Sequence, residues 1–292
     1  MSTRLEMLQL ARLAPRLLSD ATDLVARFTY SQIHPDGGFI DRAGEPDLYY
    51  TVFGMDCLAA LQLPLDEARL RAFLERFGTG EDLDFIHGCA LLRCWANLGM
   101  PPRAVIDAIL NKVEEHRAAD GAYAVAPDSN FGSCYGNFLA MSTYEAVGQT
   151  LPRPQPILAN LEQMKSSDGG YNDVPAAALG TMPATAAAVA VARGLGRPLS
   201  DEVGLWLLRQ HCPEGGFFAL PGAPMPDLLS TAVGLHAMSI LQVPTDTVKE
   251  PCLDFIDSLW VNKGAFYGNW GDEYLDCEYL FYGLLALGHL SV

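Results

Sequence analysis

Two carboxylates and a histidine at the starts of neighbouring apolar segments could bind a metal ion. Asp84 and His87 are three residues apart and so share one face of a helix, and Asp47 opens the preceding apolar segment. Histidine is the commonest metal ligand, so Asp47, Asp84 and His87 form a candidate metal site. The alternative is structural: Asp84 caps a helix, His87 is a hydrogen-bonded core residue, and Asp47, like Asp227, is an N-cap.

Asp56 could supply a catalytic acid. It lies among Phe53, Met55 and Leu58, seven residues after Tyr49 and therefore on the same helical face. If this carboxyl faces an apolar cavity, burial should raise its pKa, and a protonated carboxyl could then protonate an alkene or an allylic leaving group. The alternative is a hydrogen bond to a neighbouring hydroxyl such as that of Tyr49, because a buried carboxylate without a partner is costly.

A second acidic group lies near the C-terminus. Asp272, Glu273, Asp276 and Glu278 are interleaved with aromatic residues, and Asp276 and Glu278 stand at the start of the last apolar segment. We regard Asp276 and Glu278 as candidate catalytic carboxylates. The cluster could also hold a divalent metal with a diphosphate, or it could be a solvated rim of the protein.

Aromatic residues recur at helical spacing and could line a pocket for a hydrophobic chain, with their π faces toward any cation that forms there. The candidate binding residues are Tyr49, Tyr50, Phe53, Tyr135, Phe138, Trp270, Tyr274, Phe281 and Tyr282. The alternative interpretation is that this aromatic stripe is ordinary core.

A sequence motif that recurs along the chain indicates which elements position these side chains. Its fullest form is Gln32-Ile33-His34-Pro35-Asp36-Gly37-Gly38-Phe39, followed by Pro46-Asp47-Leu48-Tyr49-Tyr50-Thr51. Degenerate copies of the motif lie at 120–123, 168–171, 214–217 and 263–266, and residues 226–231 repeat its second half. Self-similarity at a fixed period, here roughly 45 residues, is typical of a repeat architecture.

Two kinds of helical segment alternate along the repeats. Segments that are apolar nearly all round, as in a helix buried on every side, are 48–62, 82–98, 133–147, 183–191, 227–241 and 275–287. Amphipathic segments are 5–18, 21–31, 66–77, 104–117, 158–165, 203–210 and 253–260. The alternation predicts an all-α (α/α)6 toroid, with apolar helices inside, amphipathic helices outside, a central cavity and no strands. The last segment lacks the polar face of a solenoid cap, so we expect one closed domain over residues 1–292.

The composition of the chain limits which classes of partner it could bind. The chain has 292 residues, half of them hydrophobic, and a net charge of −16, which argues against nucleic-acid backbones and anionic membranes as partners. No run reaches the roughly 18 apolar residues of a membrane span. The cysteine count is odd, at seven, and no signal peptide is evident. We therefore expect free thiols and a cytoplasmic location.

The repeated pattern Gln…Asp-Gly-Gly-Phe…Pro-Asp-x-x-x-Thr resembles the β subunits of protein prenyltransferases and the related squalene and terpene cyclases. The resemblance covers almost the whole chain from Tyr30 onward, and it implies an α/α toroid whose central funnel holds an isoprenoid chain. In the protein prenyltransferases an Asp-x-Cys pair and a His at the next inner helix bind zinc. His87 matches the His position, whereas Tyr49 stands where the Cys is expected after Asp47. The Asp-x-Asp-Asp motif of the cyclases is missing, and its nearest approaches are Asp82-Leu83-Asp84-Phe85 and Asp276-Cys277-Glu278.

Three functions follow from this resemblance. The first is an isoprenoid-binding enzyme of the prenyltransferase and terpene-cyclase type, acting on a polyprenyl or terpenoid chain in the aromatic cavity. The second is a zinc-dependent protein prenyltransferase subunit that needs a helical-repeat α partner. The third is a non-catalytic toroid that binds a lipid or a protein.

Overall fold

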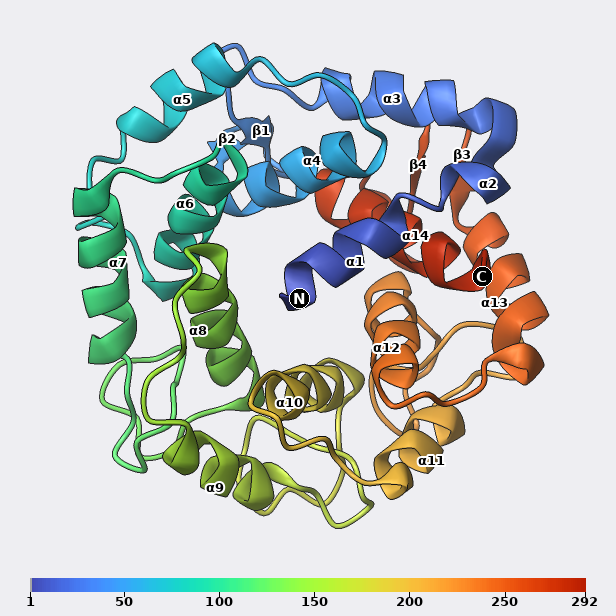
Figure 1. Ribbon diagram of the computed structural model, residues 1–292. Helices are drawn as coiled ribbons and strands as arrows, with labels where there is room; N and C mark the ends of the chain where they lie inside the picture. Colours follow the sequence, from blue (N-terminus) through green and yellow to red (C-terminus); the bar gives the residue numbers. More distant parts are fainter. Residues whose placement is uncertain (1) are drawn as a thin grey trace.

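The computed structural model describes residues 2–292 and shows a ring of helices in two layers (Figure 1). The inner helices are α4 (Leu48–Ala60), α6 (Phe85–Asn97), α8 (Cys134–Ala146), α10 (Met182–Gly194), α12 (Leu228–Ile240) and α14 (Cys277–Leu290). The outer helices are α3 (Thr22–Ser31), α5 (Glu67–Glu75), α7 (Arg103–Glu115), α9 (Pro154–Met164), α11 (Asp201–Arg209) and α13 (Asp246–Ser258). Each inner helix packs against the next, and α14 packs against α4. The ring therefore closes, and the prediction of an (α/α)6 toroid is confirmed.

The difference between the two layers follows from their sequences. In α10 almost every residue from Ala184 to Ala192 is buried, which matches a helix enclosed on all sides. In α11, Val203, Trp206 and Leu207 are buried, while Asp201 and Glu202 are exposed. The amphipathic helices thus cover the apolar ring and face water with their charged side.

The recurring motif forms the turn that joins an outer helix to the next inner helix. Gly37 has φ +108°, a conformation that favours glycine, and a side chain at Gly38 would collide with the ring of Phe73. The amide of Phe39 donates to Oγ1 of Thr51 in α4 at 2.9 Å. The pattern of an aromatic residue followed later by a threonine therefore records a hydrogen bond that ties this turn to its inner helix. Phe217 and Thr231 repeat this bond at 3.0 Å.

Two very short antiparallel ribbons were not predicted. They pair β1 (Phe39–Ile40) with β2 (Pro46–Asp47) and β3 (Trp260–Val261) with β4 (Ala265–Phe266). Strands of two residues are too short to give an alternating pattern, so the sequence could not reveal them. Each ribbon lies in a turn between an outer and an inner helix.

The N-terminal segment is broken where one helix over residues 5–18 was expected. It forms α1 (Thr3–Ala11), α2 (Pro15–Leu18) and the 3₁₀ turn η1 (Ser19–Ala21). Pro15 explains the break, because proline has no amide hydrogen with which to continue the helix.

Helix α1 begins near the centre of the ring and runs outward to α14 (Figure 1), and its first residues contact the ends of α8 and α10. Its amide at Thr3 donates to Glu145 at the end of α8 at 3.2 Å. Glu6 forms an ion pair with Arg193 at the end of α10. The inner helices start at the opposite end of the ring, so the two ends of the central cavity differ: one lies beside α1 and the other is ringed by helix N-termini.

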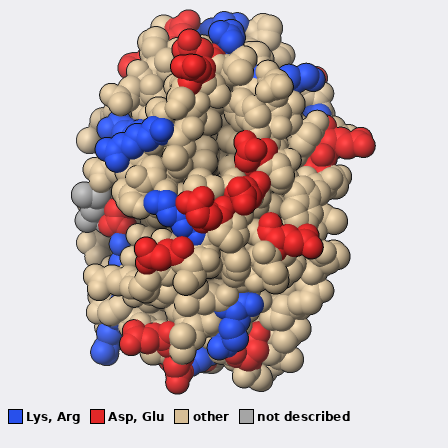
Figure 2. Space-filling view, turned by 90° about the vertical axis from the view of Figure 1, so that its right-hand side faces the viewer, with Lys and Arg blue, Asp and Glu red and all other residues tan. Residues whose placement is uncertain are grey.

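The surface carries mixed charge. On the side shown in Figure 2, the lysine and arginine side chains lie in separate groups with acidic side chains among them. Among the described residues, no helix combines the length and the apolar character needed to cross a bilayer. All seven cysteines lie within the described residues, and each is buried with a free thiol.

Candidate active site

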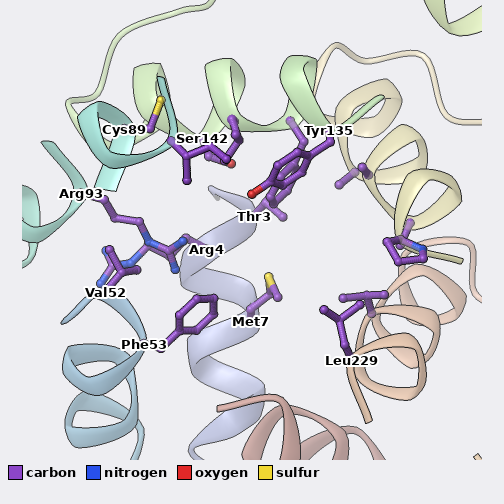
Figure 3. Close-up of a pocket in the computed structure, with 18 of the residues that line it drawn as sticks. Thr3, Arg4, Met7, Val52, Phe53, Cys89, Arg93, Tyr135, Ser142 and Leu229 are labelled. Atoms are coloured by element: carbon purple, nitrogen blue, oxygen red, sulfur yellow. The ribbon is translucent and has the colours of Figure 1, made fainter. Parts of the chain in front are cut away.

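The inner ring encloses a cavity of about 420 Å³, within the size range of small-molecule sites. Tyr49, Phe53, Tyr135 and Tyr282, which we predicted to bind a hydrophobic chain, line it. The remaining wall is mostly apolar and includes Val52, Ile86, Phe138, Leu139, Ala184, Ala187, Leu229, Val233 and Phe281. Figure 3 shows Tyr135 and Leu229 on one side of the cavity and Phe53 on the other.

A smaller hollow of about 330 Å³ adjoins the cavity at the helix-start end. Tyr49, Ile86 and Tyr135 line both spaces, and Tyr50, Asp47 and His87 line the smaller one. The predicted aromatic lining and the predicted metal ligands therefore meet at this rim.

Two aromatic residues lie elsewhere, contrary to the expectation that they bind the chain. Trp270 is 45% exposed, packs against Phe255 and donates to Ser258 at 2.9 Å. Tyr274 is 55% exposed and lies over the guanidinium of Arg42. Both belong to the long loop before α14 and contribute to the outer surface.

Glu278 holds its carboxyl beside the cavity wall. Its Oε1 accepts a hydrogen bond of 2.7 Å from the hydroxyl of Tyr49. Burial raises the pKa of Glu278 to about 6, although the bond from Tyr49 acts in the opposite direction. A carboxyl with this pKa exchanges protons near neutral pH, and it reaches the cavity through a residue that lines it.

Asp276 has a structural role at the start of α14. Its side chain is almost completely buried and accepts from the amide of Tyr279, as an N-cap does. It also accepts from Nε of Arg42 at 2.8 Å, and Arg42 contacts Asp272 as well at 3.2 Å. The acidic cluster is therefore partly neutralised by an arginine from the β1–β2 loop.

Asp173 was missed by sequence reasoning. It lines the cavity, and its Oδ1 accepts from the amide of Tyr135 at 3.0 Å, at the start of α8. The side chain is accessible, yet enough protein surrounds it that burial raises its pKa. It lies shortly after Tyr171, which ends the third occurrence of the recurring motif, and that position was a sequence signal that we did not use.

Asp56 corrects our expectation of a raised pKa. The carboxylate is fully buried, but it forms ion pairs with Arg4 of α1 at 3.0 Å and with Arg93 of α6. Burial acts to raise the pKa of Asp56, and the positive charges of Arg93 and Arg4 outweigh it, so the pKa is lowered. Asp56 is therefore an ionised group that holds two arginines, and it is poorly suited to donate a proton.

Asp47, Asp84 and His87 come together as the sequence predicted. Nδ1 of His87 lies 2.9 Å from Asp84 Oδ2, and Nε2 lies 3.1 Å from Asp47 Oδ2. The hydrogen bond with Asp47, with a smaller contribution from Asp84, raises the pKa of His87 to about 9. Asp47, Asp84 and Asp227 also accept amide hydrogens as N-caps, which confirms the capping interpretation.

Comparison with known proteins decides the family. Residues 5–87 and 196–290, more than half of the chain, match the family profile described as the prenyltransferase alpha-alpha toroid domain. The chain belongs to the prenyltransferase α/α toroid family. Curated protein sequences gave no match.

Solved structures share this toroid fold. A type II terpene cyclase from Scytonema in complex with its substrate geranylgeranyl dihydroxybenzoate is 15% identical, with a TM-score of 0.60 over 95% of this chain and 97% of that one. The same cyclase in complex with its product merosterolic acid A gives the same identity, coverage and TM-score. A protein from Actinoplanes is 14% identical, with a TM-score of 0.57 over 93% of this chain and 98% of that one.

Zinc, which the protein prenyltransferases of this toroid family use, does not fit the residues present here. Among the described residues, no three His, Cys, Asp or Glu side chains form a group that could hold a metal ion. In the nearest approach, each ring nitrogen of His87 lies within hydrogen-bond distance of a carboxylate oxygen, Asp84 Oδ2 at 2.9 Å and Asp47 Oδ2 at 3.1 Å. The position of the missing Cys is occupied by Tyr49, whose hydroxyl bonds to Glu278 instead.

Proposed function

We propose that this toroid is an isoprenoid cyclase that begins its reaction by protonating an alkene. The observation that carries the proposal is the Glu278 carboxyl, with its raised pKa, hydrogen-bonded to Tyr49 on the wall of an aromatic cavity. The structural neighbours include a terpene cyclase bound to a geranylgeranyl compound, which supports the substrate class.

The reaction balances without a cofactor. A proton moves to the less substituted carbon of the last, trisubstituted alkene of the chain, and a tertiary carbocation forms at the other carbon. Asp173 would donate this proton directly, whereas for Glu278 the Tyr49 hydroxyl would give its proton to the alkene and take one from the Glu278 carboxyl. A second alkene of the same chain attacks this cation and closes a ring. Loss of a proton from a neighbouring carbon ends the sequence, so the product is an isomer of the substrate. Solvent returns a proton to the carboxylate.

The cavity wall suits the cationic stage. The ring of Phe53 lies 5.0 Å from that of Tyr49 and 5.6 Å from that of Tyr282, measured between centroids. Aromatic faces attract a cation, more strongly when water is excluded. The apolar wall also keeps water from capturing the cation before ring closure.

Asp173 is the second candidate proton donor. It lines the cavity directly, whereas Glu278 acts through Tyr49. Both groups lie at the helix-start end, so either assignment places the reacting alkene at the same end of the cavity.

The test is cyclisation in heavy water. Farnesol, geranylgeraniol and the corresponding acids are incubated with the protein in D2O, and products are analysed by mass spectrometry. We expect an isomeric cyclic product that carries one deuterium from the initiating acid. Glu278→Gln should abolish it if Glu278 is the donor, and Asp173→Asn should abolish it if Asp173 is.

The control is Asp107→Asn, which alters an exposed carboxylate on α7, far from the cavity. Binding without any cyclic product would refute the enzyme and favour the lipid-binding module. Cyclisation that persists in both the Glu278 and the Asp173 variants would refute the assignment of the acid.

A further inference from the structure

The end of the cavity that lies beside α1 carries two arginines on one carboxylate. Arg4 from α1 and Arg93 from α6 both line the cavity, and both bind Asp56 of α4. Figure 3 shows the ends of these arginine side chains close to each other on one side of the cavity. The two arginines carry one more positive charge than Asp56 neutralises, on a cavity wall that is mostly apolar.

The arrangement turns the arginines toward the cavity. Asp56 has no exposed surface and stands behind them, whereas the side chains of Arg4 and Arg93 are 21% and 25% exposed. Nε of Arg93 is buried and has no hydrogen-bond partner among the described residues.

Two other carboxylates lie at this end of the ring. Glu6 and Glu145 do not line the cavity. Glu6 is paired with Arg193, and Glu145 accepts from the amide of Thr3. The hydroxyls of Thr3 and Ser142 lie on the same stretch of wall and add neutral polar groups.

We propose that Arg4 and Arg93 form a subsite for an anionic group, a carboxylate or a phosphate, at one end of the ligand. Arginine is suited to both, because its planar fork of N–H donors matches their paired oxygens. For the nature of the attached chain, the proposal rests on the function proposed above. The ligand is then an isoprenoid acid or an isoprenoid phosphate.

The subsite also sets the direction of the ligand. Arg93 follows Ile86, at the helix-start end of the cavity, by seven residues, which is roughly 10 Å along α6. An anion held by the arginines would therefore leave the far end of the chain beside Glu278 and Asp173. The anionic head group of the ligand and its reacting alkene are then separated along the axis of the ring.

Calorimetric titration of matched ligands tests the subsite. Farnesoic acid, farnesyl phosphate and farnesol share one chain and differ in the head group. We expect the wild type to bind at least one of the two anions roughly tenfold or more tightly than farnesol, the value of a charge-assisted hydrogen bond. The tighter of the two anions distinguishes carboxylate from phosphate.

Arg4→Gln should bring the ratio of the two affinities toward one, and Arg93→Lys should keep a preference for the anion. Arg103→Gln, which removes an exposed arginine of α7, is the matched control and should leave the ratio unchanged. The ratio is informative even if a variant loses stability, because both ligands are measured on the same folded fraction.

A second pair of ligands distinguishes failure of this subsite from failure of the isoprenoid function. Dodecanoate and dodecanol carry a straight chain instead of a prenyl chain. If the farnesyl compounds do not bind but dodecanoate is preferred over dodecanol in an Arg4-dependent manner, the subsite stands and the isoprenoid function fails. Equal binding of anion and alcohol in both pairs, an unchanged ratio in Arg4→Gln, or no binding in either pair would overturn the subsite.

Discussion

Replacement of Asp56 by asparagine should be among the more destabilising single changes in this chain. The substitution preserves shape but removes the negative charge that Arg4 and Arg93 share inside the ring. Breaking a buried ion pair by removing one partner costs about 3–5 kcal/mol, since the remaining charge is left without compensation. For a chain of this size that corresponds to a fall in Tm of about 10 °C.

Urea denaturation of the wild type and Asp56→Asn at several pH values measures the effect. The lowered pKa of Asp56 means that its contribution is present above the pKa of the unfolded chain, near 4, and is lost as the pH falls through the lower folded value. The difference in the free energy of unfolding should therefore be constant from about pH 5 to 8 and shrink below pH 4.

The control is Asp107→Asn, in an exposed pair with Arg103 on α7. Surface pairs contribute little, so this change should leave stability nearly unaltered. A loss below about 1 kcal/mol in Asp56→Asn, or a difference that grows in acid, would show that the carboxyl is protonated in the folded state. Our original expectation of a raised pKa would then be correct.

Three further predictions concern other parts of the ring. The raised pKa of His87, about 9, should stabilise the fold fully below pH 6.5 and lose that effect as the pH rises through 9, so wild type and His87→Gln should converge in urea titrations at alkaline pH. Gly215→Ala should destabilise far more than Gly44→Ala in thermal melts, because both glycines have positive φ but only at Gly215 would the added carbon meet a backbone oxygen, that of Pro251, at 2.0 Å. Plasma mass spectrometry of protein purified without a metal-affinity tag should find zinc far below one ion per chain, and stoichiometric zinc that is lost in His87→Ala would contradict the geometry of the Asp47–His87–Asp84 group.

The ring itself could be predicted because its signals are local and repeated. The contrast between apolar segments such as 227–241 and amphipathic ones such as 203–210 separates inner from outer helices without any knowledge of distant contacts. The first residue of a helix was harder to predict where the helix begins with polar residues. Helix α13 begins at Asp246, whereas its apolar stripe is visible only from Leu253 onward.

The candidate site was only partly predictable, since its charges are settled by contacts between distant segments. The neighbours of Asp56 in the sequence are apolar, which suggests a raised pKa, but the groups that decide its charge are Arg4 and Arg93, 52 and 37 residues away. Nothing in the sequence indicates that α1 contacts the ring, because the recurring motif begins after α1. The hydrogen bond between Tyr49 and Glu278 was equally invisible, although both residues were chosen separately.

The seam where α14 meets α4 has a consequence for how the protein is made. Tyr49 and Glu278 are 229 residues apart, and Arg42 and Asp276 are 234 apart, so both contacts span nearly the whole chain. A ribosome can release the earlier helix pairs, and these can pack on their neighbours, long before the last helix emerges. The Glu278 carboxyl can accept from Tyr49 only after α14 has left the exit tunnel. The bond between Tyr49 and Glu278 is thus formed last, after the helix that carries Tyr49 and the turn that carries Asp173 have been made.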